Sequence, residues 1–357
     1  MIVFVVLLLV PIIIQHFVFE HKNVNFEKKN EISLRFFFVV FALLVMFRHV
    51  SVGNDTRNYI YIFNKYCDMD WSEVIKATVE FGFAYYNKII SLFSKEPRFF
   101  LAISAVLTIA MIYPTYKRLA TDTSLTIVLF CVMSTFVMTF SGVRQMLAVG
   151  LGFVAYEFVR KKRKFMFLLV LLLAMSFHIS AFMLIFMYPL YHIKLTKKWL
   201  IGVIPIFGIV FIFNKQIFVV LTTVLAQFTK YEGGVTSTGA YMMIVLFSIF
   251  AIFSFLIPEE SLLDQETLAL RNFLLFSLSI QMFAPLHTLA MRMNYYYIIF
   301  IPLLLPKIIA CKSEKWSQFA VLGRHVMVVF FLVYFFMNAN GSGNLNVFPY
   351  HFFWENV

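Results

Sequence analysis

The chain has 357 residues, of which 61% are hydrophobic and 13% are charged, and its mean hydropathy is +0.85. A soluble domain carries about twice that share of charge, so the composition excludes an ordinary water-soluble globular protein. The net charge of +12 does not indicate nucleic-acid binding, because Lys and Arg stand in short clusters between apolar runs, as membrane topology signals do. The sequence predicts an all-α, polytopic integral membrane helix bundle.

About twelve apolar segments approach the 20 or so residues that a membrane-spanning helix requires. The first segment has no basic leader and no cleavage site, so we expect it to be retained as a span. The segments 165–177 and 179–193 are either one long helix or two half-spans that meet at His178. The predicted spans are 1–19, 34–50, 98–116, 124–140, 143–159, 165–177, 179–193, 199–213, 240–257, 271–288, 292–310 and 317–337.

The distribution of Lys and Arg predicts the orientation of these spans. Two crossings between residues 165 and 193 collect most basic residues on one side, whereas one crossing would divide them evenly. Two crossings are therefore favoured, with both termini outside the cytoplasm. Residues 51–97 then form the largest extracytoplasmic loop, with an amphipathic stretch suited to the membrane interface, and 214–239 form a second extracytoplasmic segment. No repeat or soluble domain is evident, so we predict a single membrane domain over 1–357.

Isolated ionisable residues gather on the predicted outer side. Such residues cost about 2.5–3.5 kcal/mol at mid-membrane, which makes them candidates for function. Each also has an ordinary explanation: Arg48 and Arg144 as snorkelling cations, and His178 as a structural histidine. Arg324, inside the last span, is expected to be a snorkelling residue. The candidates are Arg48, Asp55, Arg57, Glu80, Arg144, His178, His287, Arg292 and His351.

The arginines among these candidates indicate a polyanionic ligand. A guanidinium stays charged and matches phosphate oxygens with two parallel hydrogen bonds. A lipid-linked pyrophosphate suits this membrane depth, and a carboxylate-bearing sugar is the alternative. Arg292 and Tyr296 are four residues apart and would share one helix face. Three scattered cysteines with no CxxC pair, and no carboxylate cluster, predict neither a metal site nor a cofactor.

Six short motifs occur in order between about residues 45 and 350. They are Arg48 to Tyr59 (R-x4-G-x-D-x3-Y), Glu80-Phe81-Gly82-Phe83, Val143-Arg144-Gln145-Met146-Leu147-Ala148, Ser176-Phe177-His178-Ile179-Ser180-Ala181, Arg292 with Tyr296, and Phe348-Pro349-Tyr350. In this order they resemble the landmarks of the EpsG/Wzy-type polysaccharide polymerases. His287 is a departure, since an acidic residue often precedes the arginine in related chains.

The resemblance implies a membrane glycosyltransferase in the bacterial inner membrane, with its active site facing outward. Such an enzyme transfers a growing glycan from undecaprenyl pyrophosphate to the non-reducing end of another lipid-linked repeat unit, in O-antigen, capsule or exopolysaccharide synthesis. The expected partners are the undecaprenyl-pyrophosphate-linked oligosaccharide, membrane lipid and a chain-length regulator protein, without nucleic acid.

The expected roles follow from that reaction. Arg144 and Arg292 would bind pyrophosphates, and Arg48 would support them or hold the second lipid. We expect the general base among His178, Asp55 and Glu80, with His178 first because irregular backbone at membrane depth normally lines a cavity. Asp55 has the alternative role of folding the outer loop through Arg57. The remaining residues expected at the substrate are Arg57, Gln145, Tyr296 and Tyr350.

Two other functions compete with this interpretation. A lipid-linked oligosaccharide flippase or other transporter would also use arginines, but alternating access usually builds a mid-membrane site from paired repeats. The candidates here lie toward one face and no repeat is evident, which favours chemistry on one side. Another membrane glycan transferase or an O-acyltransferase stays open, since a histidine such as His178 would serve there too.

Overall fold

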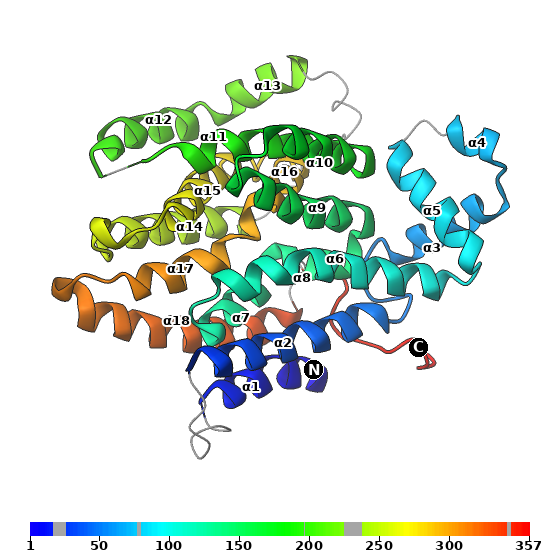
Figure 1. The fold of residues 1–357 in the computed structure, drawn as a ribbon, viewed down its shortest axis with the longest axis horizontal. Helices are drawn as coiled ribbons and strands as arrows, with labels where there is room; N and C mark the ends of the chain where they lie inside the picture. Colours follow the sequence, from blue (N-terminus) through cyan, green and yellow to red (C-terminus); the bar gives the residue numbers. More distant parts are fainter. Residues whose placement is uncertain (17–25, 77–79, 196, 225–237, 341–343) are drawn as a thin grey trace. The chain divides into compact units, whose positions relative to one another are not determined.

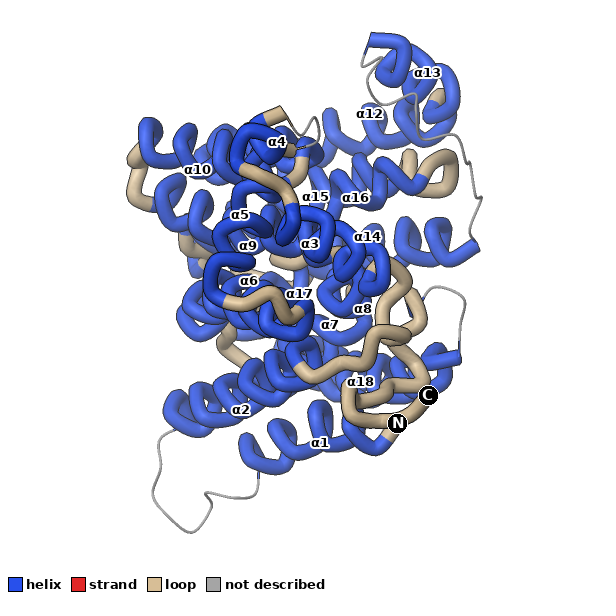
Figure 2. Tube along the Cα trace, turned by 90° about the vertical axis from the view of Figure 1, so that its right-hand side faces the viewer, coloured by secondary structure: helices blue, strands red, loops and turns tan. Residues whose placement is uncertain are grey.

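The computed structural model describes residues 1–16, 26–76, 80–195, 197–224, 238–340 and 344–357. The structure is 81% helical, and its described residues form no β-strand (Figure 2). The predicted all-α class is confirmed. The chain divides into two compact units: Met1–Ile185 with Arg324–Val357 forms unit 1, and Phe186–Gly323 forms unit 2.

Unit 1 is built around an aromatic core. Phe4 contacts Phe136 and Phe335 edge-on, at centroid distances of 6.1 and 6.0 Å, and Phe41 stacks on Phe136 at 5.2 Å. Helices α1 and α2 lie side by side, as do α9 and α10 (Figure 1). Its helices are α1 (Ile2–His16), α2 (Phe26–Met46), α3 (Thr56–Asp68), α4 (Trp71–Ile75), α5 (Phe81–Phe93), α6 (Pro97–Leu119), α7 (Thr123–Val132), α8 (Ser134–Ser141), α9 (Val143–Arg160), α10 (Lys164–Phe177) and most of α18 (Ser317–Met337).

Unit 2 is organised around α15, which packs against α11, α14, α16 and α17. The Arg271 guanidinium of α15 is fully buried and pairs with Glu260 at 2.8 Å, so its charge is compensated inside the unit. The helices of this unit are α11 (Met187–His192), α12 (Leu200–Ile212), α13 (Asn214–Val224), α14 (Thr238–Leu256), α15 (Gln265–Gln281), α16 (Thr288–Ile298) and α17 (Ile301–Ala310).

Every predicted span overlaps a helical segment, but fewer helices meet the requirements for a crossing. Three described helices are long and apolar enough, and the number rises to six if each of three bent helix pairs is one span. The three are Pro97–Leu119, Gly239–Leu256 and Glu314–Met337. Apolar helices of this kind fit a membrane protein, and the count of about twelve spans stays a prediction.

The predicted loops contain helices. Residues 51–97 hold α3, α4 and α5, and the segment 214–239 begins as α13, while 225–237 lie outside the described residues. Between 165 and 193 the helix is broken: α10 ends at Phe177, His178 is extended, and a 3₁₀ helix covers Ile179–Phe186. The break therefore falls at His178, the position at which the sequence pattern allowed one.

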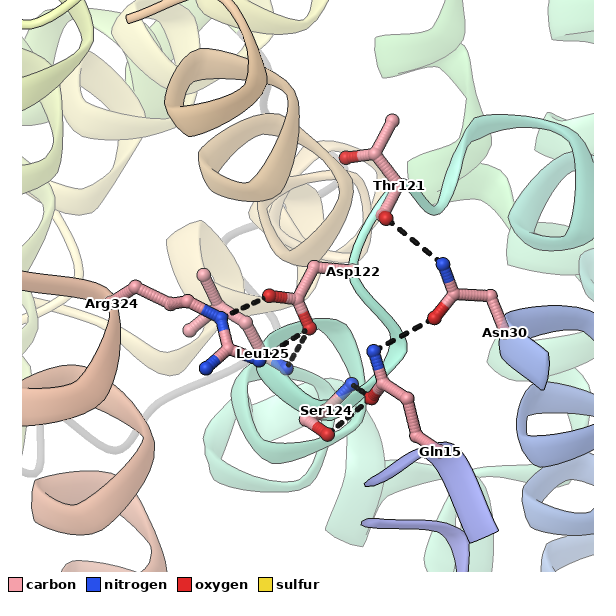
Figure 3. Close-up of polar contacts among 7 residues, drawn as sticks. All are labelled: Gln15, Asn30, Thr121, Asp122, Ser124, Leu125 and Arg324. Carbon is pink, nitrogen blue, oxygen red and sulfur yellow. Dashed lines mark hydrogen bonds and ion pairs between the residues drawn. The ribbon is translucent and has the colours of Figure 1, made fainter. Parts of the chain in front are cut away.

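A polar cluster joins the ends of several unit 1 helices (Figure 3). Gln15 of α1 donates to Asn30 of α2 at 2.8 Å, and Asn30 donates to the Thr121 carbonyl at 3.1 Å. Asp122 accepts from Leu125 N–H at the start of α7 and forms an ion pair with Arg324 of α18. Arg324 was expected to snorkel, and it is instead held by a carboxylate within unit 1, which secures α18 to α7.

Candidate functional site

A tight turn brings residues 48–56 against the end of α8. Gly53 has φ +85°, a left-handed conformation that favours glycine, and a Cβ there would lie 2.4 Å from the Phe140 carbonyl oxygen. The Thr56 hydroxyl closes the turn by donating to the Val52 carbonyl at 2.7 Å. The first motif therefore lies directly beside the α8–α9 turn that carries Arg144.

Arg48 is buried at the C-terminal end of α2. Its guanidinium donates to the Val45 carbonyl and, through Nε, to Thr56 Oγ1 at 3.4 Å, which places the cation where the helix end is negative. Nη2 has no hydrogen-bond partner in the described part of the chain. The Tyr350 hydroxyl donates to the Leu44 carbonyl of the same helix at 2.8 Å. Arg48 and Tyr350 therefore both donate to backbone carbonyls in the last turn of α2.

Asp55 contacts the turn before Arg144. The Ser141 hydroxyl donates to Asp55 Oδ2 at 3.4 Å and accepts from the Asp55 backbone N–H at 3.2 Å. The alternative that Asp55 folds the loop through Arg57 is not seen, since the described residues show no ion pair between them. Arg57 is exposed.

Glu80 joins two other motifs. Its Oε2 lies 2.7 Å from Arg144 Nη1, and its Oε1 accepts from the Ile179 N–H at 2.7 Å and lies 3.5 Å from His178 Nδ1. Its φ is +50°, a left-handed conformation that non-glycine residues seldom adopt. Such backbone is concentrated at functional positions.

Gly82 sets the distance between α5 and α10. A Cβ at this position would lie 2.0 Å from Ser176 Oγ and 2.8 Å from Ser176 Cβ, so only glycine fits without a shift. This close approach brings the start of α5 to the end of α10. The Glu80 carboxylate consequently reaches the helix break at His178.

His178 is almost enclosed, with 8% of its side chain exposed. Its Nδ1 lies 3.0 Å from Ser180 Oγ and 3.3 Å from the Ser180 backbone nitrogen. Glu80 Oε1 lies on the same side of the ring. These contacts orient the imidazole beside Glu80 and Ser180, and a histidine so oriented can take part in proton transfer.

Arg144 keeps part of its hydrogen-bonding capacity. One fifth of its side chain is exposed, at 21%, and its Nε has no hydrogen-bond partner in the described part of the chain. The guanidinium lies 5.9 Å from the centre of the Phe83 ring. The Arg144 side chain is therefore partly exposed beside Glu80, while its Nε is buried.

Burial and the positive charge of Arg144 shift the pKa of two groups here in opposite directions. Burial raises the pKa of Glu80 above its usual range, opposed by Arg144 and by the Ile179 N–H. Burial also raises the pKa of Tyr66 in α3, and the nearby Arg144 charge lowers it. Tyr66 was not identified from the sequence, although it lies seven residues after Tyr59 and so falls on the same helix face.

The remaining candidates belong to the first turn of α9 and to α16 with its N-cap. Gln145 is buried in the first turn of α9, with 1% exposure. Arg292 and Tyr296 lie four residues apart in α16 of unit 2, where Tyr296 is buried. The His287 Nδ1 accepts from the Leu289 N–H and caps the same helix. No group of three or more His, Cys, Asp or Glu suited to a metal ion occurs in the described ranges.

These features indicate a helical membrane protein in which the side chains of Arg144, Glu80 and His178 form a cluster. The model of the EpsG family matches residues 31–352, nearly the whole chain, and the protein belongs to that family. The matched region contains Arg48, Glu80, Arg144, His178 and Arg292. No curated protein and no solved structure is matched.

Proposed function

We propose that the protein is a polysaccharide polymerase of the outer face of the bacterial inner membrane. It transfers a growing glycan from undecaprenyl pyrophosphate to the non-reducing sugar of another lipid-linked repeat unit. Membership of the EpsG family supports this class of reaction. The observation that carries the proposal is the Glu80 carboxylate, which contacts Arg144 and His178 from two other motifs of the resemblance.

The reaction needs little covalent help from the protein. The anomeric carbon–oxygen bond to pyrophosphate breaks as the acceptor hydroxyl oxygen bonds to that carbon, and the acceptor proton goes to a base. Pyrophosphate leaves with its electrons, so catalysis requires positioning and neutralisation of the departing charge. The reaction as proposed uses no metal ion.

Each side chain has a role that suits its contacts. Arg144 binds the departing pyrophosphate with the donors that Glu80 leaves free, and Arg292 binds the pyrophosphate of the other substrate. His178 accepts the proton of the acceptor hydroxyl, and the Glu80 carboxylate, 3.5 Å from its Nδ1, stabilises the imidazolium that forms. Asp55 is the alternative base, and its contact with Ser141 places it beside the Arg144 turn. A chain-length regulator remains a proposed partner.

The proposal is tested by deleting the gene in its host and separating the surface glycan on a gel. We expect the deletion strain to carry glycan of one repeat unit, and wild-type complementation to restore the ladder of longer chains. Loss of even the single-unit glycan would place the block before polymerisation and favour the flippase. A normal ladder in the deletion strain would contradict both functions.

A further inference from the structure

An apolar groove runs along unit 2 between α12, α14 and α15. It encloses about 560 Å³, and its walls include Val203, Phe207, Ile252 and Leu278. Ser248 is the one polar residue among its described lining residues, and its hydroxyl donates to the Ile244 carbonyl at 2.8 Å. The groove therefore offers no free polar group and suits a hydrocarbon ligand.

The length of the groove matches one leaflet of a bilayer. Its α14 wall extends from Ser248 to Leu256, which at 1.5 Å per residue is roughly 12 Å. Half of a typical hydrocarbon core is about 15 Å. A single acyl chain entering from one membrane surface would fill this depth.

One end of the groove carries positive charge. Phe255 lines the groove, and its ring lies 4.0 Å from the Arg271 guanidinium, which donates to the Leu195 carbonyl at 2.6 Å. Arg271 therefore connects the segment around Leu195 to the end of the groove that Phe255 lines. Lys194 and Lys198 flank it, both are exposed, and neither lies within ion-pair distance of an acidic residue that the structure describes.

Two of the acidic residues that follow α14 are paired with cations of unit 2. Glu260 pairs with Arg271 at 2.8 Å and Asp264 with Lys307 at 3.1 Å. Trp199, with 59% exposure, directly precedes α12, whose first two turns supply Val203 and Phe207. Tryptophan favours the level of lipid head groups, so the charged end of the groove has the character of a membrane interface.

We propose that this groove binds an anionic glycerophospholipid. One acyl chain lies between α12, α14 and α15, and the phosphate lies at Lys194 and Lys198, with Trp199 at head-group level. Exposed lysines beside an apolar groove select anionic over zwitterionic lipids, because the chain contacts are the same and only the head-group charge differs. The positive-inside rule predicts the cytoplasmic leaflet for this site. The inference is independent of the polymerase proposal.

The test uses tryptophan fluorescence of the full-length protein in phosphatidylcholine vesicles. Replacement of Trp71, Trp316 and Trp354 by Phe leaves Trp199 as the reporter. Phosphatidylglycerol or phosphatidylcholine with bromine at acyl carbons 6 and 7 is then added, since bromine quenches only nearby rings. We expect half-maximal quenching at a roughly tenfold lower mole fraction of the anionic lipid.

Three variants of this reporter protein separate charge from chain binding. Lys194→Gln with Lys198→Gln should abolish the preference for phosphatidylglycerol, whereas Lys161→Gln with Lys164→Gln in unit 1 should retain it. Ala251→Phe narrows the groove and should reduce quenching by both lipids. Equal quenching by the two lipids in the reporter protein would overturn the inference. So would a preference that survives the Lys194 and Lys198 replacements, or quenching that Ala251→Phe leaves unchanged.

Discussion

Arg144 and Glu80 form an ion pair in which Nη1 and Oε2 are 2.7 Å apart, and Glu80 is the less exposed partner, at 10% against 21%. The pair joins the α8–α9 turn to the start of α5. Breaking a buried pair leaves one charge uncompensated and costs roughly 3–5 kcal/mol, and the partial exposure of Arg144 lowers that range. Replacing either Arg144 or Glu80 should therefore change both the stability of the fold and the binding of an anion at Arg144.

Arg144→Ala should reduce polymerisation by at least about 100-fold, because it removes a guanidinium that neutralises the departing pyrophosphate. Arg144→Lys should recover only part of the rate, since an ammonium lacks the planar fork. The measurement is the ladder in the complemented deletion strain, with protein levels in the membrane compared by immunoblot. The matched control is Arg163→Ala, an exposed arginine after α9, which should behave as wild type.

The dependence of activity on pH should report Glu80. Burial raises the pKa of this carboxyl, and only its ionised form pairs with Arg144 and holds His178, so the rate should rise as the pH passes above the ordinary glutamate range. Glu80→Gln should remove that rise. An unchanged profile in Glu80→Gln would assign the titration to another group.

The contribution of Glu80 to the free energy of unfolding should fall as the pH rises, whereas activity should increase. A raised folded-state pKa means that the contribution is complete below the unfolded-state pKa and falls as the pH rises through the folded-state value. The difference in thermal midpoint between wild type and Glu80→Gln, measured across this range in detergent, gives the sign directly. A contribution that grows with pH would show that Arg144 outweighs burial.

Gly82→Ala should separate α5 from α10, because its Cβ would overlap Ser176. We expect activity to fall sharply, since Glu80 would no longer reach His178. Ser176→Gly in the same chain should restore part of the activity by making space. Gly208→Ala is the control: no atom lies within 4 Å of its added Cβ, and alanine favours the helix by up to about 1 kcal/mol. Failure of Ser176→Gly to restore any activity would argue against the packing explanation.

Asp122→Ser should destabilise the protein by about 3 kcal/mol, because Arg324 would be left without its carboxylate in an apolar helix. Serine can still cap α7, so the loss reports the ion pair rather than the cap. Arg324→Leu combined with Asp122→Ser should recover most of the stability. Thermal unfolding in detergent measures the three variants, and a double variant as unstable as Asp122→Ser would contradict the pairing.

The extent of prediction from sequence differs between the fold and the site. Apolar runs identified the helical segments, since a helix in lipid must be apolar along its length. They did not predict the bends within α7–α8 and α16–α17, of 63° and 42°, because such bends depend on tertiary packing. They also did not predict the two compact units.

Within the site, motif order identified Glu80, Arg144 and His178 but not their contacts. Their association depends on the helix break at His178, which the sequence pattern allowed, and on Gly82 lying against Ser176, a contact between distant residues that no local pattern shows. Arg324 was misjudged for the same reason: its partner, Asp122, is 202 residues away in the chain. Long-range pairs of this kind are not encoded in spacing along one helix.

Reconstitution of the purified protein in liposomes tests the central claim most directly. Lipid-linked repeat units would be added, and both the length of the glycan and the release of undecaprenyl pyrophosphate would be measured. Our account predicts glycan of two or more repeat units with one undecaprenyl pyrophosphate released per bond formed, abolished by Arg144→Ala and retained in Arg163→Ala. Movement of intact single units across the bilayer, without chain growth or pyrophosphate release, would contradict it.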